Sequence, residues 1–177
     1  MSPEFTRENT RRERYNLKLD NAKSLPAAIV SINFDFDENL AFLIRSAACY
    51  GINKVFVIGS VPSRSLLNSK SGSLYDYVDI KSFSNPSDFK NYCNDYGYKI
   101  VSLELSEYSE SIYDYKFSFD KKTAIVLGNE TSGVPVDLLI NNDSIYIPML
   151  GPGYCLNASQ TGTAVMQEYT RQYLDSI

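Results

Sequence analysis

"TAIVLGNETSGVP", residues 123–135, is an apolar run that ends at a glycine and passes into polar residues and a proline. A continuous run of apolar and β-branched residues is typical of a strand buried on both faces of a sheet. Gly128 and Gly133 permit a close backbone approach or a positive φ, and Pro135 suits the first turn of a helix. The stretch therefore predicts a strand, a tight loop and a helix, which is the building unit of an α/β sheet.

Runs of the same kind recur along the chain, at residues 27–32, 54–59, 77–83, 99–105, 123–128 and 144–149. Helical stretches lie between most of them, and one of these aligns Leu40, Leu43, Ile44, Ala47 and Ala48 on one stripe before Gly51. This alternation predicts an open, mainly parallel sheet with helices on both faces, closed by a helix after residue 156. The serine-rich residues 60–74 are expected to form a mobile loop.

Composition limits the class of protein. The 177 residues are 44% hydrophobic and 21% charged, which fits one soluble domain with a real core. No apolar run approaches the roughly 18 residues of a membrane span, and the N-terminus does not resemble a secretory signal. The chain has no histidine, and Cys49, Cys93 and Cys155 lack metal-type spacing. We therefore expect a cytoplasmic protein without a disulfide, a metal or a membrane partner.

Charge is distributed unevenly. Residues 1–25 carry six Lys/Arg and four Asp/Glu, so their net charge is +2 and that of the remainder is −6. An acidic body argues against unspecific nucleic-acid binding, while a basic arm suits contact with a phosphate backbone or simply solvent. We predict a basic N-terminal arm over residues 1–26 and one α/β domain over residues 27–177.

Ligands of such sheets bind outside the carboxyl ends of the strands. Two of the segments that leave a strand are rich in polar and small residues: "LGNETSGVP" (127–135) and "GPGYCLNAS" (151–159). Neither contains a Walker-type GK[ST] or a GxGxxG pattern, so ATP and dinucleotide binding lose their main support.

Single residues in these segments have ordinary explanations. Asn39 and Asn157 are each suited to cap a helix, and Asn157 also suits holding a hydroxyl or a cofactor carboxylate. Arg45, beside an apolar helical stripe, either extends into solvent or directs its guanidinium at a phosphate. Cys155 is expected to be a small buried side chain rather than a nucleophile, because no histidine can activate it.

Taken in order and spacing, these segments resemble the SPOUT superfamily of methyltransferases, in its SpoU (TrmH-like) branch. The resemblance rests on three motifs: "NLAFLIRSAACYG" (39–51), "LGNETSGVP" (127–135) and "IPMLGPGYCLNAS" (147–159). It covers residues 27–174. Cys155 stands where most members of the family have serine.

The resemblance implies a deep trefoil knot at the carboxyl end of the sheet, formed by loops 127–135 and 147–157. It also implies binding of S-adenosylmethionine in a bent shape by backbone groups of these loops. Gly128 would leave room there for the adenine. The cofactor-binding positions expected from the resemblance are Leu103, Gly128, Ile147, Cys155 and Leu156.

The implied reaction is methyl transfer to a ribose 2′-OH of RNA, in tRNA rather than rRNA. The family assigns proton removal and phosphate positioning to Arg45, although guanidinium chemistry alone favours the phosphate role. Asn39 and Glu130 would orient the arginine and the ribose, and Asn157 would hold the hydroxyl. The resemblance further implies a homodimer in which each site is completed by the partner's arginine.

Two other functions are compatible with the residues. Cys155 in the third motif leaves open an inactive SPOUT-fold protein that only binds RNA, which robust S-adenosylmethionine binding would contradict. The strand and helix pattern alone also fits a flavodoxin-like nucleotide-binding domain, which RNA-dependent methyl incorporation would exclude.

Overall fold

The computed structural model describes residues 9–153 and 155–177, and the first eight residues of the expected basic arm lie outside them. Within these residues the chain forms a seven-stranded sheet in the order β3-β2-β1-β6-β4-β7-β5, and every pair of neighbouring strands is parallel. The mainly parallel sheet expected from the sequence is thereby confirmed. The strands are β1 (Ala27–Ile32), β2 (Lys54–Ile58), β3 (Asp79–Phe83), β4 (Tyr98–Leu103), β5 (Glu110–Ser111), β6 (Lys122–Leu127) and β7 (Asp143–Tyr146).

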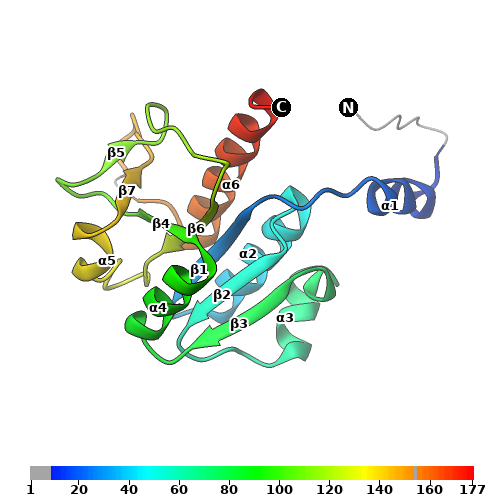
Figure 1. Ribbon diagram of the computed structural model, residues 1–177. Coiled ribbons are helices and arrows are strands. Elements are labelled where there is room, and N and C mark those ends of the chain that lie inside the picture. Colours follow the sequence, from blue (N-terminus) through cyan, green and yellow to red (C-terminus); the bar gives the residue numbers. More distant parts are fainter. Residues whose placement is uncertain (1–8, 154) are drawn as a thin grey trace.

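Helices cover both faces of the sheet (Figure 1). One hydrophobic cluster joins the sheet to α2, α3 and α6, and a second joins it to α4 and α5. The helices are α1 (Arg11–Asp20), α2 (Asp37–Tyr50), α3 (Arg64–Lys70), α4 (Pro86–Tyr96), α5 (Val136–Ile140) and α6 (Ala158–Asp175), with a short 3-10 turn at Tyr75–Tyr77.

Strand β1 shows why the apolar runs are continuous. Ala27 and Ile29 pack into the cluster on one face, whereas Ala28 and Val30 pack into the cluster on the other. All six residues of the strand are buried. Because successive side chains of a strand point to opposite faces, a central strand covered on both sides has no solvent-facing position for a polar residue.

Residues 60–74 differ from the expected mobile loop, which was wrong. They contain α3, whose N-cap Ser63 accepts a hydrogen bond from the Leu66 N–H, and Leu67 on this helix is fully buried. The helix packs against α2. Seven residues are too few to display a helical period, and the serines of this segment are typical of a loop. The sequence therefore did not predict a capped helix that a single buried leucine packs against the core.

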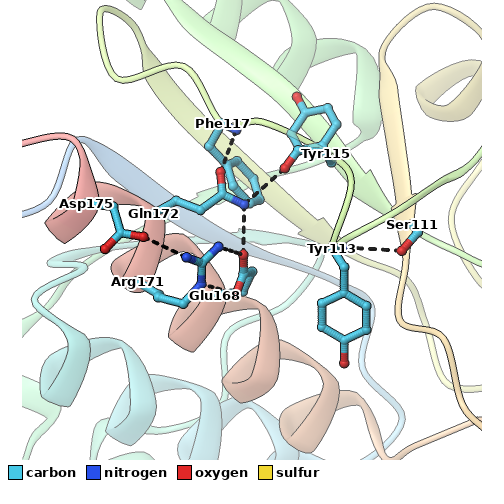
Figure 2. A network of polar contacts seen from close by, with 8 residues as sticks. All are labelled: Ser111, Tyr113, Tyr115, Phe117, Glu168, Arg171, Gln172 and Asp175. Atoms are coloured by element: carbon cyan, nitrogen blue, oxygen red, sulfur yellow. Dashed lines mark hydrogen bonds and ion pairs between the residues drawn. The ribbon is translucent and has the colours of Figure 1, made fainter.

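Helix α6 is fixed at its C-terminal half by the polar network of Figure 2. Gln172 is buried; its Oε1 accepts the Phe117 N–H at 3.1 Å, and its Nε2 donates to the Tyr115 carbonyl at 3.0 Å. The same Nε2 donates to Glu168, which also pairs with Arg171. The segment that leads into β6 is thus held to the last helix, so α6 has a fixed direction relative to the sheet.

Near its start, α6 approaches α2 closely. Gly162 permits this contact, because a Cβ there would lie 2.4 Å from Cδ1 of Leu43 and 2.7 Å from Cδ1 of Leu127. Ser46 Oγ and Thr163 Oγ1 share a hydrogen bond of 2.7 Å between the two helices. The N-terminal part of α6 is therefore held against the middle of α2.

Helix α1 stands apart from the sheet (Figure 1). Residues 12–20 are exposed, and a capping box between Thr10 and Glu13 begins the helix. Tyr15 contacts Tyr77 through its hydroxyl. The domain boundary at residue 26 stays a prediction. Among the described residues, no helix combines the length and the apolar character that a membrane crossing requires.

Candidate functional site

The candidate site lies where the strand order reverses. From β1 the chain adds β2 and β3 on one side, then returns to build β6, β4 and β7 on the other. Loops that leave adjacent strands in opposite directions form a crevice at the carboxyl ends of the strands. Here the loop after β1 (33–36) and the loop after β6 (128–135) meet.

Asp35 ties these two loops together. Its carboxylate accepts hydrogen bonds from Asn129 Nδ2 and from Thr131 Oγ1, both at 2.9 Å. Its backbone N–H donates to Glu130 Oε2 at 2.8 Å. Sequence reasoning missed Asp35, although an acid in the turn directly after a buried strand at the sheet's carboxyl edge was an available signal.

Three of the predicted site residues, one from each motif, form a single hydrogen-bonded chain. Asn39 Nδ2 donates to Glu130 Oε1 at 2.5 Å, and Asn157 Nδ2 donates to Asn39 Oδ1 at 2.9 Å. Asn157 Oδ1 in turn accepts the Ser159 N–H at 2.9 Å. We call this the Asn39–Glu130–Asn157 chain. Because each amide has one donor and one acceptor end, these contacts fix the orientation of both asparagines.

The two asparagines differ in their relation to the helices. Asn157 caps α6, as one of its expected roles required. The capping role expected for Asn39 is wrong, because Phe36 is the N-cap of α2 and Asn39 is the third residue of the helix. Its side chain is 4% exposed and turns inward to the carboxylate. Burial of an amide is tolerated here because both of its ends are hydrogen-bonded.

Arg45 lies on α2, the helix that carries Asn39, but takes no part in the Asn39–Glu130–Asn157 chain. It is exposed and has no hydrogen-bond or ion-pair partner among the described residues, whereas Arg64 pairs with Asp76 and Arg171 with Glu168. Its guanidinium lies over Gly72 instead. Within one subunit the structure therefore does not bring Arg45 to the other predicted catalytic residues.

The expected cofactor positions fall into two groups. Leu103, Gly128 and Ile147 lie at the carboxyl ends of the adjacent strands β4, β6 and β7, where Leu103 is in register with Leu127 and Ile145. Cys155 and Leu156 are exposed in the segment that leads into α6. The burial expected for Cys155 was wrong, because this segment stands outside the core.

The reason expected for Gly128 also needs correction. A Cβ at Gly128 would lie 2.3 Å from the carbonyl carbon of Gly133 and 2.5 Å from the nitrogen of Val134. The glycine therefore makes room for the loop's own backbone rather than for a ligand. Glu104, which sequence reasoning missed, supports the same turn by accepting the Val134 N–H at 3.0 Å.

Beside the Asn39–Glu130–Asn157 chain the surface forms an open depression of about 430 Å³ between α2 and α6. Its lining residues are Asn39, Phe42, Asn157, Ser159, Gln160 and Thr163. Amides and hydroxyls line it together with the ring of Phe42, and no lining residue is charged, so it is suited to hold an uncharged group that has both apolar and hydrogen-bonding parts. In residues 9–153 and 155–177 no group of three or more His, Cys, Asp or Glu side chains is placed to hold a metal ion.

Comparison with known proteins gives a family match over most of the chain. Residues 26–167 match the model of the SpoU rRNA Methylase family. This range contains all three motifs and therefore every residue of the Asn39–Glu130–Asn157 chain.

Individual relatives agree with this match. The chain is 30% identical over 155 residues to the mouse tRNA (guanosine(18)-2'-O)-methyltransferase TARBP1, covering 82% of this chain and 9% of that protein. It is 28% identical over 147 residues to the tRNA (guanosine(18)-2'-O)-methyltransferase of Aquifex aeolicus, covering 79% of this chain and 66% of the relative. The chain thus spans less than two thirds of either protein.

A solved structure supports the fold. An AdoMet-bound rRNA methyltransferase from Sinorhizobium meliloti superposes with a TM-score of 0.73 at 22% identity, over 84% of this chain and 56% of that one. At this level of identity the likeness establishes the common architecture alone.

Proposed function

The chain belongs to the SpoU rRNA Methylase family of the SPOUT superfamily, and from this premise we propose that it is an S-adenosylmethionine-dependent RNA ribose 2′-O-methyltransferase that acts on tRNA. The observation that carries the proposal is the convergence of all three family motifs in one hydrogen-bonded chain, Asn39–Glu130–Asn157. The tRNA target is favoured by the relatives from mouse and A. aeolicus, both of which are named as tRNA methyltransferases.

The strand ends fit S-adenosylmethionine chemically. Leu103, Gly128 and Ile147 form a neutral edge across three adjacent strands, and Gly151 and Gly153 leave open space in front of their backbone. Backbone N–H and C=O groups at such an edge can read an uncharged adenine. When bound, S-adenosylmethionine supplies a methyl group on a positively charged sulfur. The solved AdoMet-bound relative supports this choice of cofactor.

Asn157 is the residue that we expect to hold the target hydroxyl. A side-chain amide nitrogen has two hydrogens, and among the described residues Asn157 Nδ2 uses one of them, toward Asn39 Oδ1. The second remains for a substrate oxygen in the adjoining depression. Asn39 and Glu130 hold the amide in this direction, and such preorganised orientation contributes several kcal/mol to the rate.

We assign Arg45 to the RNA phosphate and, following the family, to removal of the ribose proton. Its guanidinium has no carboxylate partner among the described residues and is free to bind a phosphate in a bidentate manner. The 2′-oxygen must lose its proton as it gains the methyl group, and the arginine can accept that proton only in its neutral form. A phosphate-bound arginine beside that oxygen stabilises the charge that develops there.

Because Arg45 stands apart from the Asn39–Glu130–Asn157 chain in one subunit, we propose a homodimer with shared sites. Exposed apolar side chains near the depression, Phe36, Phe42 and Leu156, offer a surface for a second copy. We also propose the trefoil knot of loops 127–135 and 147–157. In its favour, the chain leaves β7 beyond β4 and β6 and returns past both to α2, against which α6 packs.

Labelled-methyl transfer tests the proposal. Purified protein is incubated with tritiated S-adenosylmethionine and unfractionated tRNA or rRNA, and the modified nucleotide is then mapped. We expect incorporation into a 2′-O-methyl nucleotide of tRNA, lost in Arg45→Ala and not rescued by Arg45→Lys, since an ammonium cannot replace the planar fork. Absence of both cofactor binding and transfer to any RNA would instead favour the inactive RNA-binding protein, and transfer to rRNA alone would overturn the choice of tRNA.

Subunit mixing tests the shared site. Equal amounts of Arg45→Ala and Asn157→Ala protein, each inactive alone, are exchanged with one another. Random pairing makes about half of the dimers mixed, and each mixed dimer has one site with both lesions and one with neither. About a quarter of the wild-type activity should return. No recovery after confirmed subunit exchange would exclude an arginine that acts across the interface.

A further inference from the structure

The guanidinium of Arg45 rests on the backbone that follows α3. A Cβ built on Gly72 would lie 3.1 Å from Nη1 of Arg45 and 3.5 Å from its Cζ. Both distances involve the guanidinium group itself, so the charged end of the side chain passes directly over the bare Cα of the glycine.

The backbone beneath the guanidinium is firmly held. Leu67 and Ser71 are fully buried, and the Ser71 N–H donates to the Leu67 carbonyl at 2.9 Å. The Ser73 N–H donates to the Asn68 carbonyl at 2.9 Å. Since α3 packs against α2, the helix that carries Arg45 also carries the segment that supports its side chain.

A lysine of the same segment pairs with an acidic residue of α2. Lys70, two residues before Gly72, pairs at 3.5 Å with Glu38, which lies two turns before Arg45 on the same side of α2. Among the described residues, Arg45 itself has no carboxylate partner. Its guanidinium is therefore supported from one side while its hydrogen-bonding edges stay available.

We propose that Gly72 is a positioning residue for Arg45, resting on the proposed function of Arg45 at the RNA phosphate. A Cβ at Gly72, 3.1 Å from Nη1, requires the guanidinium to shift by a few tenths of an ångström, and a longer side chain shifts it further. Phosphate contact and proton removal both depend on the place of the guanidinium, because a misplacement of about 1 Å can cost on the order of 100-fold in rate.

The chain offers a matched control for the backbone strain. Gly72 and Gly97 have almost the same positive φ, +70° and +71°, and each follows a helix. In the part of the chain that the structure describes, no atom beyond the chain neighbours lies within 4 Å of a Cβ built on Gly97. Substitution at either position therefore places a side chain at the same positive φ, but only substitution at Gly72 meets an arginine.

The experiment compares alanine and asparagine at both positions, because asparagine accepts a positive φ with little strain. With unfractionated tRNA as substrate, we expect methyl transfer to fall about threefold in Gly72→Ala and about tenfold or more in Gly72→Asn. Gly97→Ala and Gly97→Asn should match the wild type, and S-adenosylmethionine affinity should stay the same in all four. Equal activity of the Gly72 and Gly97 variants would overturn the inference.

A second readout does not depend on activity. The chain has seven arginines, so its guanidinium Nε–Hε groups give few NMR signals, and the signal of Arg45 is identified by its loss in Arg45→Lys. It should shift in the Gly72 variants and stay in place in the Gly97 variants. An unshifted signal would also overturn the inference. Full activity of Arg45→Lys, in contrast, would contradict the proposed function while the NMR result still reported on the contact.

Discussion

Two loops at the carboxyl edge of the sheet, 128–135 and 147–157, look alike in sequence because each has two glycines and at least one proline, yet they are built differently. In the first, a Cβ at Gly128 or Gly133 would lie within 2.5 Å of another atom. In the second, no atom of the described residues beyond the chain neighbours lies within 4 Å of a Cβ at Gly151 or Gly153. The glycines of the first loop allow close packing of its backbone, whereas those of the second loop leave the backbone accessible.

The polar contacts of the two loops differ in the same way. Loop 128–135 is held by Asp35 and Glu104, and Asn129 also accepts the N–H groups of Thr131 and Ser132. In loop 147–157, Leu150 and Leu156 are exposed, and Asn157 anchors the loop at the start of α6. One loop is therefore a preformed support, and the other is suited to close over a ligand.

The largest effect is expected for Gly128→Val, which tests this difference between the loops. The added side chain must displace the backbone of Gly133 and Val134, so we expect a loss of about 3 kcal/mol in the free energy of unfolding. Binding of S-adenosylmethionine should be lost with the loop. Urea unfolding and calorimetry measure the two effects.

Gly151→Val is the control in the other loop. Because its Cβ meets open space, its free energy of unfolding should change by no more than about 0.5 kcal/mol. Similar losses in the two variants would show that the loops do not differ in packing. Unchanged cofactor affinity in a folded Gly128→Val protein would place the pocket elsewhere.

A smaller effect is expected for Asn39→Ala, which removes the middle of the Asn39–Glu130–Asn157 chain. Glu130 Oε1 and Asn157 Nδ2 would each lose a partner, which costs about 1–3 kcal/mol for groups near the interior. Methyl transfer should be lost, because Asn157 would no longer be oriented. Asn91→Ala, an exposed change within α4, is the control and should alter stability by no more than about 0.5 kcal/mol.

These contacts show what the sequence could and could not predict. The parallel sheet followed from continuous apolar runs, and the crevice followed from polar residues placed directly after strands. The inward turn of Asn39 did not, because a first-turn asparagine has the same sequence pattern whether it caps the helix or points into the protein. Asp35 and Glu104 were missed because their partners lie about 95 and 30 residues away in the chain.

A still smaller change is expected for Asp35→Ala, which removes two of the hydrogen bonds between loop 128–135 and the loop after β1. The carboxylate is exposed, so the loss of its bonds to Asn129 and Thr131 should cost only about 1 kcal/mol. The effect should be local: hydrogen exchange at the Gly133 and Val134 amides should accelerate, while exchange in residues 149–153 stays as it was. Uniform acceleration across both loops would contradict the view that only one of them is fastened.

The smallest effect is expected at Cys155, in the open loop. Burial raises the pKa of Cys93 to about 12, whereas Cys49 and Cys155 are exposed. A thiol reagent should therefore modify two cysteines of the folded protein, and Cys155→Ser should remove one of them. Because the exposed side chain packs against no core residue, the variant should keep its stability and its methyl transfer, since serine restores the residue that most members of the family have at this position. A folded but inactive Cys155→Ser protein would make the thiol a nucleophile, and the open loop would then belong to the chemistry rather than to cofactor binding alone.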